Sequence, residues 1–299
     1  MTRILRQVLI LVLYFLLFSG SGLADQKETG LNIMEEVFKR HELFPFSYEE
    51  QTMIMTDSAG NQDVRKVRQF LRVEADKTVK YLLVFDNPTE IRGVAMRVIQ
   101  YPDGLVENAI FLPAFGKELA TDHGKSQASY LLGTDFALED VIKTLADFQY
   151  VRQADQKIAR IDYFVVDAFP LNQAVQQNSG YSRQRHFIGQ DNFFIVRTDY
   201  FDRSGRLFKR LSRHDLNKMT QQMWRANMIL MENFRESHTT LIKIDRRIFS
   251  GDYVPSHIFT RSWLQENQHI QGADNRFLSQ AFGRIHKPSE DKTEIIMGN

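Results

Sequence analysis

Short segments of alternating apolar and polar residues follow one another along most of the chain, from about residue 48 to residue 248. Alternation with a period of two predicts half-buried β-strands. Turn-forming residues separate the segments, as in Ser58-Ala59-Gly60-Asn61 and Asp202-Arg203-Ser204-Gly205. Parallel strands need long crossover connections, usually helices, and these are missing here, so the strands are expected to pair antiparallel. The predicted strands are 48–57, 64–74, 79–85, 93–100, 105–112, 150–152, 157–166, 185–189, 193–202, 206–213, 223–234 and 239–248.

Two short helices are predicted beside these strands. Asn32 is a typical helix start, and the apolar stripe after it predicts an amphipathic helix over 32–41. The second helix is predicted after a cap at Thr134-Asp135, with two acidic residues in its first turn. The side chains expected to be buried are Ile33, Met34, Val37 and Phe38 on the first helix and Leu138, Val141, Ile142 and Leu145 on the second. Residues 257–264 would add a last strand or a turn of helix.

Several predicted strands are apolar on both faces, including residues 81–85, 192–196 and 223–234. The chain also contains 23 Phe, more than its 10 Tyr and 2 Trp together. A strand that is apolar on both faces belongs to a sheet that is covered on both sides. Helices can cover one side, and either packed side chains or a lined cavity can fill the other. Met and Phe suit both, so periodicity does not choose between them, and a packed core is the default expectation.

The N-terminus has the layout of a secretory signal peptide. Arg3 and Arg6 precede an uninterrupted apolar run of 11 residues, 8–18, and small residues follow at Gly22 and Ala24. This order predicts cleavage after Ala24 and export of the mature chain. The alternative is a membrane anchor, which is disfavoured because spanning a bilayer takes about 20 apolar residues. Cleavage would leave 36 basic and 37 acidic residues, a formal charge of −1 in place of +1.

Composition and motifs exclude most kinds of chemistry. The chain has 38 Lys+Arg against 37 Asp+Glu and no Cys, which disfavours bulk nucleic-acid binding and excludes thiol chemistry and lipidation of an N-terminal Cys. The eight His show no metal-ligand spacing, and no nucleophile elbow, phosphate loop or dinucleotide motif occurs. The sequence therefore predicts no catalytic residue, no metal and no cofactor, and hence a protein that is not an enzyme.

Two polar clusters keep an alternative open. Asp122, His123 and Ser126 are interpreted as loop solvation, and the alternative is an exported hydrolase. The basic residues of 183–186 and 206–213 are interpreted as solvated strand edges, which charges protect from edge-to-edge pairing. The alternative for these basic residues is a surface for an anionic partner such as phospholipid headgroups.

A set of short motifs follows in one order along the chain. The motifs are Phe85-Asp86-Asn87-Pro88, Ile91-Arg92-Gly93-Val94-Ala95, Pro102-Asp103-Gly104, Phe111-Leu112-Pro113-Ala114, Gly133-Thr134-Asp135-Phe136 with Glu139-Asp140, Met231-Glu232-Asn233, and Thr239-Thr240-Leu241-Ile242-Lys243-Ile244. In this order they resemble the outer-membrane lipoprotein-sorting-like family, whose members have a LolA-like fold. The resemblance covers about residues 32–264. It indicates a divergent periplasmic relative and not the sorting carrier itself, because that carrier is shorter.

The resemblance implies a single antiparallel, strongly curved sheet that forms an incomplete β-barrel, covered by a few short helices and containing a hydrophobic lumen. Such folds carry acyl chains of lipids or lipoproteins across the periplasm without catalysis, in transport directed to the outer membrane. An inner-membrane lipid exporter is a further implied partner, and nucleic acid is not one. The alternative function is an adaptor subunit of a resistance-nodulation-division type envelope transporter. The expected organisation is a signal peptide (1–24), a LolA-like half-barrel domain (25–266) and a polar, flexible tail (267–299).

Candidate site residues follow from strand alternation and from the motifs. The side chains expected to line the lumen and bind lipid are Leu82, Val84, Met96, Val98, Phe111, Phe194, Trp224, Met228 and Leu230. The family-motif residues are Arg92, Gly93, Pro113, Gly133, Asp135, Glu139 and Asp140. A structural role is favoured for the motif residues, with Arg92-Gly93 fixing a bend and Asp135 capping a helix.

Overall fold

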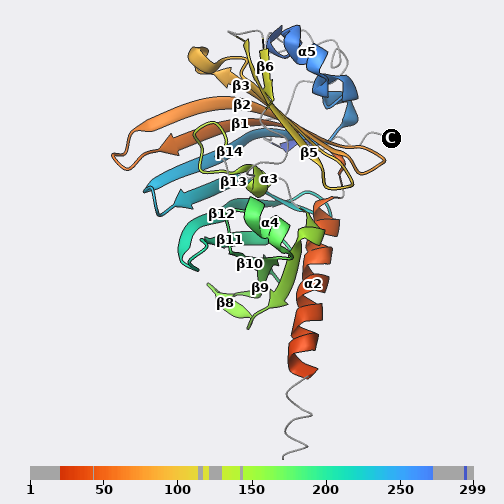
Figure 1. The fold of residues 1–299 in the computed structure, drawn as a ribbon, viewed down its shortest axis with the longest axis vertical. Coiled ribbons are helices and arrows are strands. Elements are labelled where there is room, and N and C mark those ends of the chain that lie inside the picture. Colours follow the sequence, from red (N-terminus) through yellow and green to blue (C-terminus); the bar gives the residue numbers. More distant parts are fainter. Residues whose placement is uncertain are drawn as a thin grey trace, which may run out of the picture.

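The structure is a computed structural model that describes residues 21–42, 44–113, 117–120, 130–141, 144–271 and 293–294. Thirteen strands form one antiparallel sheet in the order β6-β5-β4-β3-β2-β1-β14-β13-β12-β11-β10-β9-β7. The sheet curves strongly and does not close, since β6 and β7 stand at its two ends (Figure 1). The predicted fold, a mainly β incomplete barrel with a few short helices, is therefore confirmed.

The elements have the following bounds. The strands of the sheet are β1 (Phe46–Thr56), β2 (Gln62–Val73), β3 (Val79–Asn87), β4 (Ala95–Gln100), β5 (Val106–Leu112), β6 (Lys117–Ala120), β7 (Phe148–Arg152), β9 (Ile161–Pro170), β10 (Arg183–Gly189), β11 (Ile195–Phe201), β12 (Leu207–Lys218), β13 (Trp224–Asn233) and β14 (His238–Ile248). Beside them, β8 (Gln156–Ile158) pairs with β9, and β15 (Thr293–Glu294) pairs with β14. The helices are α2 (Ser21–His41), α3 (Leu138–Val141), α4 (Gln173–Asn178), α5 (Arg261–Gln265) and α6 (Gln268–Gln271), with 3-10 turns η1 (Thr89–Ile91), η3 (Leu145–Asp147), η4 (Gly251–Tyr253) and η5 (Ser256–Phe259).

The sheet consists of two meanders, β1–β6 and β7–β14, joined in its middle. The joint is the antiparallel pair of β1, the first strand of the first meander, and β14, the last strand of the second. In this pair Tyr48 lies opposite Ile248 and Thr56 lies opposite Thr239. Local turns set the hairpins within each meander. In the first of them, the Asp57 carboxylate accepts backbone N–H groups at 2.9 Å, and Asp202 does the same in the turn between β11 and β12. Residues 130–141, here called the crossing segment, lie along the chain between the two meanders.

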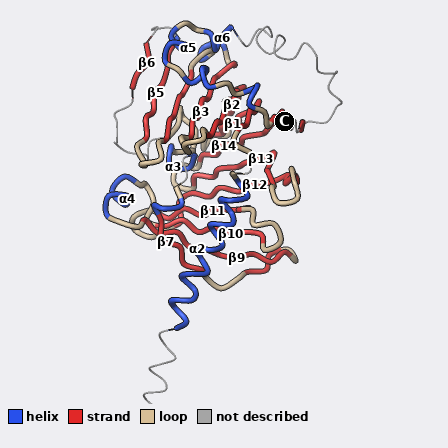
Figure 2. Tube along the Cα trace, turned by 90° about the vertical axis from the view of Figure 1, so that its right-hand side faces the viewer, coloured by secondary structure: helices blue, strands red, loops and turns tan. Residues whose placement is uncertain are grey.

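Helix α2 packs on the inner face of the second meander, along β7 and its neighbours (Figure 2). The predicted stripe is confirmed, since Ile33, Met34 and Val37 are buried and Phe38 packs against them. The predicted helix start at Asn32 is wrong, because α2 is already helical from Ser21. Gly30 allows the close approach of α2 to β7: a Cβ there would lie 2.9 Å from backbone atoms of that strand.

The C-terminal segment from η4 to α6 covers the opposite face of the first meander (Figure 1). Apolar side chains of this segment, such as Tyr253, Phe259 and Leu264, pack against the residues of β1–β5 that point to this face. His269 is fully buried there, and its Nε2 contacts the Gly93 carbonyl oxygen at 2.8 Å. The folded part therefore continues past residue 266, and the predicted flexible tail starts too early at 267. Residues 272–292 and 295–299 lie outside the described residues.

Several predicted elements differ from those in the structure. Residues 157–166 were expected as one strand but form β8 and the start of β9, because Ala159 and Arg160 adopt positive φ angles and turn the chain. No strand was predicted between residues 112 and 150, yet β6 pairs with β5. Within the described residues the second predicted helix is only the four-residue α3, and α4 had no sequence prediction. The segment 257–264 is helical, as η5 and α5.

The predicted signal peptide falls mainly on residues 1–20, which lie outside the described residues, so its cleavage stays a prediction. No described helix is both long enough and apolar enough to cross a membrane.

Candidate functional site: a pocket on the inner face of the sheet

A pocket of about 390 Å3 lies on the inner face of the sheet, where the two meanders, α2 and the crossing segment meet. This volume lies within the roughly 300–1,000 Å3 that small-molecule sites occupy. Most of the lining is apolar. Representative side chains are Met53 (β1), Leu71 (β2), Leu83 (β3), Met96 (β4), Ile229 (β13), Ile242 (β14) and, from the loops, Phe136 and Phe193. Both meanders therefore contribute to one apolar surface, which only the closure of β1 on β14 brings together.

Three of the nine predicted lipid-binding residues line this pocket: Met96, Phe194 and Trp224. Val98 faces the same side as Met96 and packs in one cluster with it and Leu138, but Val98 is 1% exposed and does not line the pocket. The structure thus contains a cavity, as the resemblance implied. Six of the nine predicted residues do not line it: Leu82, Val84, Val98, Phe111, Met228 and Leu230.

The error on β3 concerns the face of the strand. Leu82 and Val84 lie on the opposite face, together with Phe111 of β5, in the core beneath the C-terminal segment. Tyr81, Leu83 and Phe85 line the pocket instead. Because β3 is apolar on both faces, the sequence carried no signal that distinguished one face from the other.

The error on β13 has a visible sequence signal. Met228 is 36% exposed and Leu230 does not line the pocket, whereas Ile229 does. The inward positions on this and the neighbouring strands include Arg213, Arg225 and Arg247. Arginines spaced along apolar strands could have marked the pocket face, because charged residues on the inside of a sheet require a polar site there.

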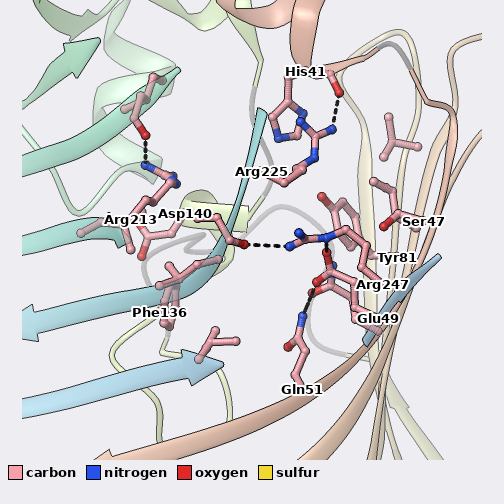
Figure 3. Close-up of a pocket in the computed structure, with 18 of the residues that line it drawn as sticks. His41, Ser47, Glu49, Gln51, Tyr81, Phe136, Asp140, Arg213, Arg225 and Arg247 are labelled. Atoms are coloured by element: carbon pink, nitrogen blue, oxygen red, sulfur yellow. Dashed lines mark hydrogen bonds and ion pairs between the residues drawn. The ribbon is translucent and has the colours of Figure 1, made fainter. Parts of the chain in front are cut away.

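One part of the pocket is polar and centred on a buried ion pair (Figure 3). The Arg247 Nε atom lies 2.6 Å from the Glu49 carboxylate, and the two side chains are 3% and 10% exposed. Gln51 donates to the same carboxylate at 2.7 Å. The Arg247 guanidinium also donates to the Ala226 carbonyl at 2.9 Å, so this pair joins β1, β14 and β13.

The acidic motif residues fix the crossing segment to the inner face of the sheet. The Asp135 carboxylate accepts the Thr240 hydroxyl at 2.8 Å and lies 2.6 Å from Nδ1 of His238, both on β14. The prediction that Asp135 caps a helix is therefore wrong, because its side chain binds a strand. Asp140 is paired with Lys209 of β12 at 2.7 Å, and both side chains are 0% exposed.

The hydroxyl of Tyr181 also donates to Asp140, at 2.8 Å. Glu139 points to the other side, where it accepts the Ser179 hydroxyl at 2.6 Å and the Gly180 backbone N–H at 2.9 Å. The structural role that was favoured for these acidic residues agrees with these contacts.

The remaining motif residues lie at bends. Gly93 has φ +81°, a conformation that favours glycine, and a Cβ there would lie 2.5 Å from Ile270 and 3.1 Å from Pro113. Gly133 also has φ +81°. Arg92 is exposed beside Gly93. The predicted bend at Arg92-Gly93 is therefore present, and Gly93 is needed both for its φ angle and for the approach of α6.

Burial raises the pKa of the Glu139 carboxyl to about 7, although its hydrogen bonds from Ser179 and Gly180 favour the charged form and Asp140 raises it further. The folded-state value lies above the unfolded value of about 4.3. The contribution of Glu139 to stability is therefore fully present below the unfolded pKa and is lost as the pH rises through about 7. A difference of one in pKa is worth about 1.4 kcal/mol.

We expect the free energy of unfolding of the unmodified protein to fall between about pH 5 and pH 8 relative to that of Glu139→Gln. Gln cannot ionise, so the variant lacks this dependence. Chemical denaturation of both proteins at several pH values measures the difference. Parallel stability curves over this range would contradict the prediction.

The basic clusters of the sequence are mostly paired in the structure. Arg183 and Arg185 both contact the Asp167 carboxylate, at 3.1 and 2.7 Å, and Arg210 contacts Asp199 at 2.6 Å. These contacts favour the interpretation of the basic residues as part of the protein's own surface over a free surface for an anionic partner. The prediction that they lie on strand edges is wrong, because β10 and β12 each pair with a strand on both sides. The Asp122, His123 and Ser126 cluster lies outside the described residues. Within the described residues, no group of three or more His, Cys, Asp or Glu side chains is arranged to hold a metal ion.

A sequence model of the DUF1329 family, described as an uncharacterized protein, matches residues 77–266, more than half of the chain. The chain belongs to the DUF1329 family. The matched part of this DUF1329 protein includes β3, the crossing segment and all of the second meander, and hence most of the elements that line the pocket. No curated protein matches the chain in sequence.

The fold of this DUF1329 protein is similar to those of solved structures. A candidate outer membrane lipoprotein-sorting protein domain from Vibrio parahaemolyticus has a TM-score of 0.74 at 22% identity, covering 80% of this chain and 99% of that one. A DUF1329 family protein from Desulfovibrio piger has a TM-score of 0.72 at 21% identity, with the same coverage. A LolA superfamily protein from Nitrosomonas europaea has a TM-score of 0.60 at 14% identity, covering 78% and 98%. These similarities show that the fold is LolA-like.

Proposed function

We propose that this protein is a non-enzymatic carrier or receptor that binds an acyl chain of a lipid or lipoprotein in the pocket. We place it in the periplasm, in transport directed to the outer membrane, on the signal-peptide pattern of the sequence and the names of two proteins of similar fold. The observation that carries the proposal is the mainly apolar pocket on the inner face of an open sheet. An inner-membrane lipid exporter stays a predicted partner on the resemblance alone.

The apolar lining supplies the driving force for binding. Moving a methylene group from water into an apolar site is worth about 0.8 kcal/mol, so a chain of several carbons binds without any specific polar contact. Phe and Met side chains in the lining, such as Met53, Met96 and Phe136, adapt to chains of different shape. A non-directional contact of this kind suits a cargo that must later be released.

Two adjacent residues of β13 offer a matched test of the pocket. Ile229 lines it, whereas Met228 points to the other face and is 36% exposed. We expect Ile229→Trp to fill part of the pocket and to weaken binding of a dansyl-labelled fatty acid about tenfold, the equivalent of losing contact with roughly two methylenes. Met228→Trp is expected to bind like the unmodified protein. Fluorescence titration measures the affinities, and thermal unfolding checks that both variants are folded.

Two results would overturn the proposal. One is a lack of binding of the fatty acid to the unmodified protein, together with no lipid in mass spectra of extracts of the purified protein. The other is an equal affinity of the folded Ile229→Trp and Met228→Trp variants, since the chain would then bind somewhere other than the pocket.

A further inference from the structure

Two arginine side chains face the pocket without a carboxylate partner. Arg225 donates to the carbonyl oxygens of His41, at 2.7 Å, and Trp224, at 3.0 Å. Arg213 donates to the carbonyl oxygen of Ile195 at 3.2 Å. Carbonyl groups satisfy hydrogen bonds but do not neutralise a positive charge. Among the residues that the structure describes, neither guanidinium forms an ion pair.

Two fully buried cations near the pocket are neutralised. Arg247 is paired with Glu49 at 2.6 Å, and Lys209 with Asp140 at 2.7 Å.

Among the charged lining side chains that are at least partly buried, only those of Arg213 and Arg225 lack an ion pair within the described residues. Glu42 and Lys77 also line the pocket without an ion pair there, but both are exposed. Both guanidinium groups are partly buried. A charge that is withdrawn from water without a counter-ion is costly, so such a charge is expected where a ligand supplies the opposite one.

The surroundings of Arg225 add to this imbalance, although the nearby Glu49 carboxylate offsets part of it. Burial, and then the nearby Arg247, lower the pKa of Arg225 to about 10. Figure 3 shows Arg225 and Arg247 reaching into the same part of the pocket from β13 and β14. Even with its pKa lowered, Arg225 remains charged at neutral pH, and an anion beside it would relieve both the burial and the repulsion.

A hydroxyl donor lies on the facing strand. Tyr81 of β3 lines the same pocket, and its ring comes from the first meander, opposite Arg225. Its hydroxyl makes no hydrogen bond to any described residue, and burial raises the pKa of Tyr81 to about 12, so it keeps its proton and can donate it. Tyr81 and Arg225 thus offer donors from two sides of the pocket.

We propose that Arg225, with Tyr81 and with the charge of Arg213, binds the anionic headgroup of an amphiphile whose acyl chain occupies the apolar part of the pocket. The headgroup chemistry is a carboxylate or phosphate, because a guanidinium binds both through two parallel hydrogen bonds. This inference rests on the proposed function and narrows it to acidic lipids or fatty acids held inside the pocket by both ends.

Ligands with equal chains and different headgroups separate this inference from the proposed function. The probes are dodecanoate and dodecyl phosphate, with dodecanol as the neutral ligand, each measured by displacement of a dansyl-labelled acyl amide at about pH 7.5. We expect the two anions to bind about ten- to a hundredfold more tightly than dodecanol, as for hydrogen bonds to a charged group. Arg225→Gln should remove this preference and leave the affinity for dodecanol unchanged. Tyr81→Phe, which keeps the ring, should reduce the preference in part.

A matched control is Arg206→Gln, since the Arg206 side chain is 79% exposed in a turn far from the lining residues. It should leave all three affinities unchanged. If Arg225→Gln does not fold, Arg213→Gln and Tyr81→Phe test the same preference.

Each failure has a distinct meaning. Equal binding of dodecanol and the two anions to the unmodified protein would overturn the headgroup site while leaving the acyl carrier in place. Competition by inorganic phosphate or acetate as strong as that by the dodecyl ligands would overturn the amphiphile and indicate a site for a free anion. No binding of any of the three dodecyl ligands would overturn the proposed function itself.

Discussion

Replacing Lys209 with methionine is expected to lower the free energy of unfolding by about 3–5 kcal/mol, because the change leaves the Asp140 carboxylate buried without its counter-ion. Both side chains of this pair are 0% exposed, so water cannot replace the lost partner. The crossing segment should lose its contact with β12 at the same time, while Asp135 still holds it to β14. Denaturant unfolding measures the loss, and acyl-probe binding measures the effect on the pocket.

Two further variants make this prediction specific. Lys157 pairs with Asp162 on the surface at 3.3 Å with side chains 64% and 55% exposed, so Lys157→Met should change stability little. Combining Lys209→Met with Asp140→Asn removes both charges and should recover part of the lost stability. If Lys209→Met cost no more than Lys157→Met, the buried pair would not stabilise the fold as we infer.

Phe111→Ala is expected to lower the free energy of unfolding by about 3–5 kcal/mol, the usual cost of removing a fully buried phenylalanine ring. Phe111 is 0% exposed and its ring meets that of His269 edge to face at 5.1 Å. It lies beneath the C-terminal segment, on the face of the sheet away from the pocket. The folded variant should therefore bind an acyl probe as tightly as the unmodified protein does.

Phe234→Ala is the matched control for this prediction, since Phe234 is 45% exposed and should contribute little to stability. Denaturant unfolding and fluorescence titration of the two variants give both quantities. Weaker acyl binding by Phe111→Ala under conditions where it is fully folded would show that Phe111 contacts the ligand, as strand alternation first predicted.

The sequence was informative about strands because their pattern is local. The period of two, the polar turns and the position of Pro88 after β3 each depend on neighbouring residues, and they placed most strands to within a few residues. Positions that depend on distant contacts were missed. Asn32 is typical of a helix start, but α2 extends past it to Ser21. Asp135 is typical of a cap, but Thr240 and His238 of β14 are its partners.

The site was predicted in kind but not in detail. A strand such as β3, apolar on both faces, predicts that both sides of the sheet are covered, and this is what the structure shows. It does not indicate that Tyr81, Leu83 and Phe85 face the pocket while Leu82 and Val84 face the core. A shift of one residue exchanges the two faces, and nothing local distinguishes them when both are apolar.

By itself the sequence determined an antiparallel, mainly β chain with more apolar strand surface than a one-faced sheet can use, because periodicity and turn chemistry are properties of adjacent residues. Only the tertiary structure decided which face encloses a pocket. It did so by pairing β1 with β14, by placing the C-terminal segment on one face and by holding the crossing segment on the other through Asp140 and Lys209. The same closure brings Tyr81 and Arg225, far apart in the chain, to one pocket, since contacts between distant residues exist only once the chain has folded.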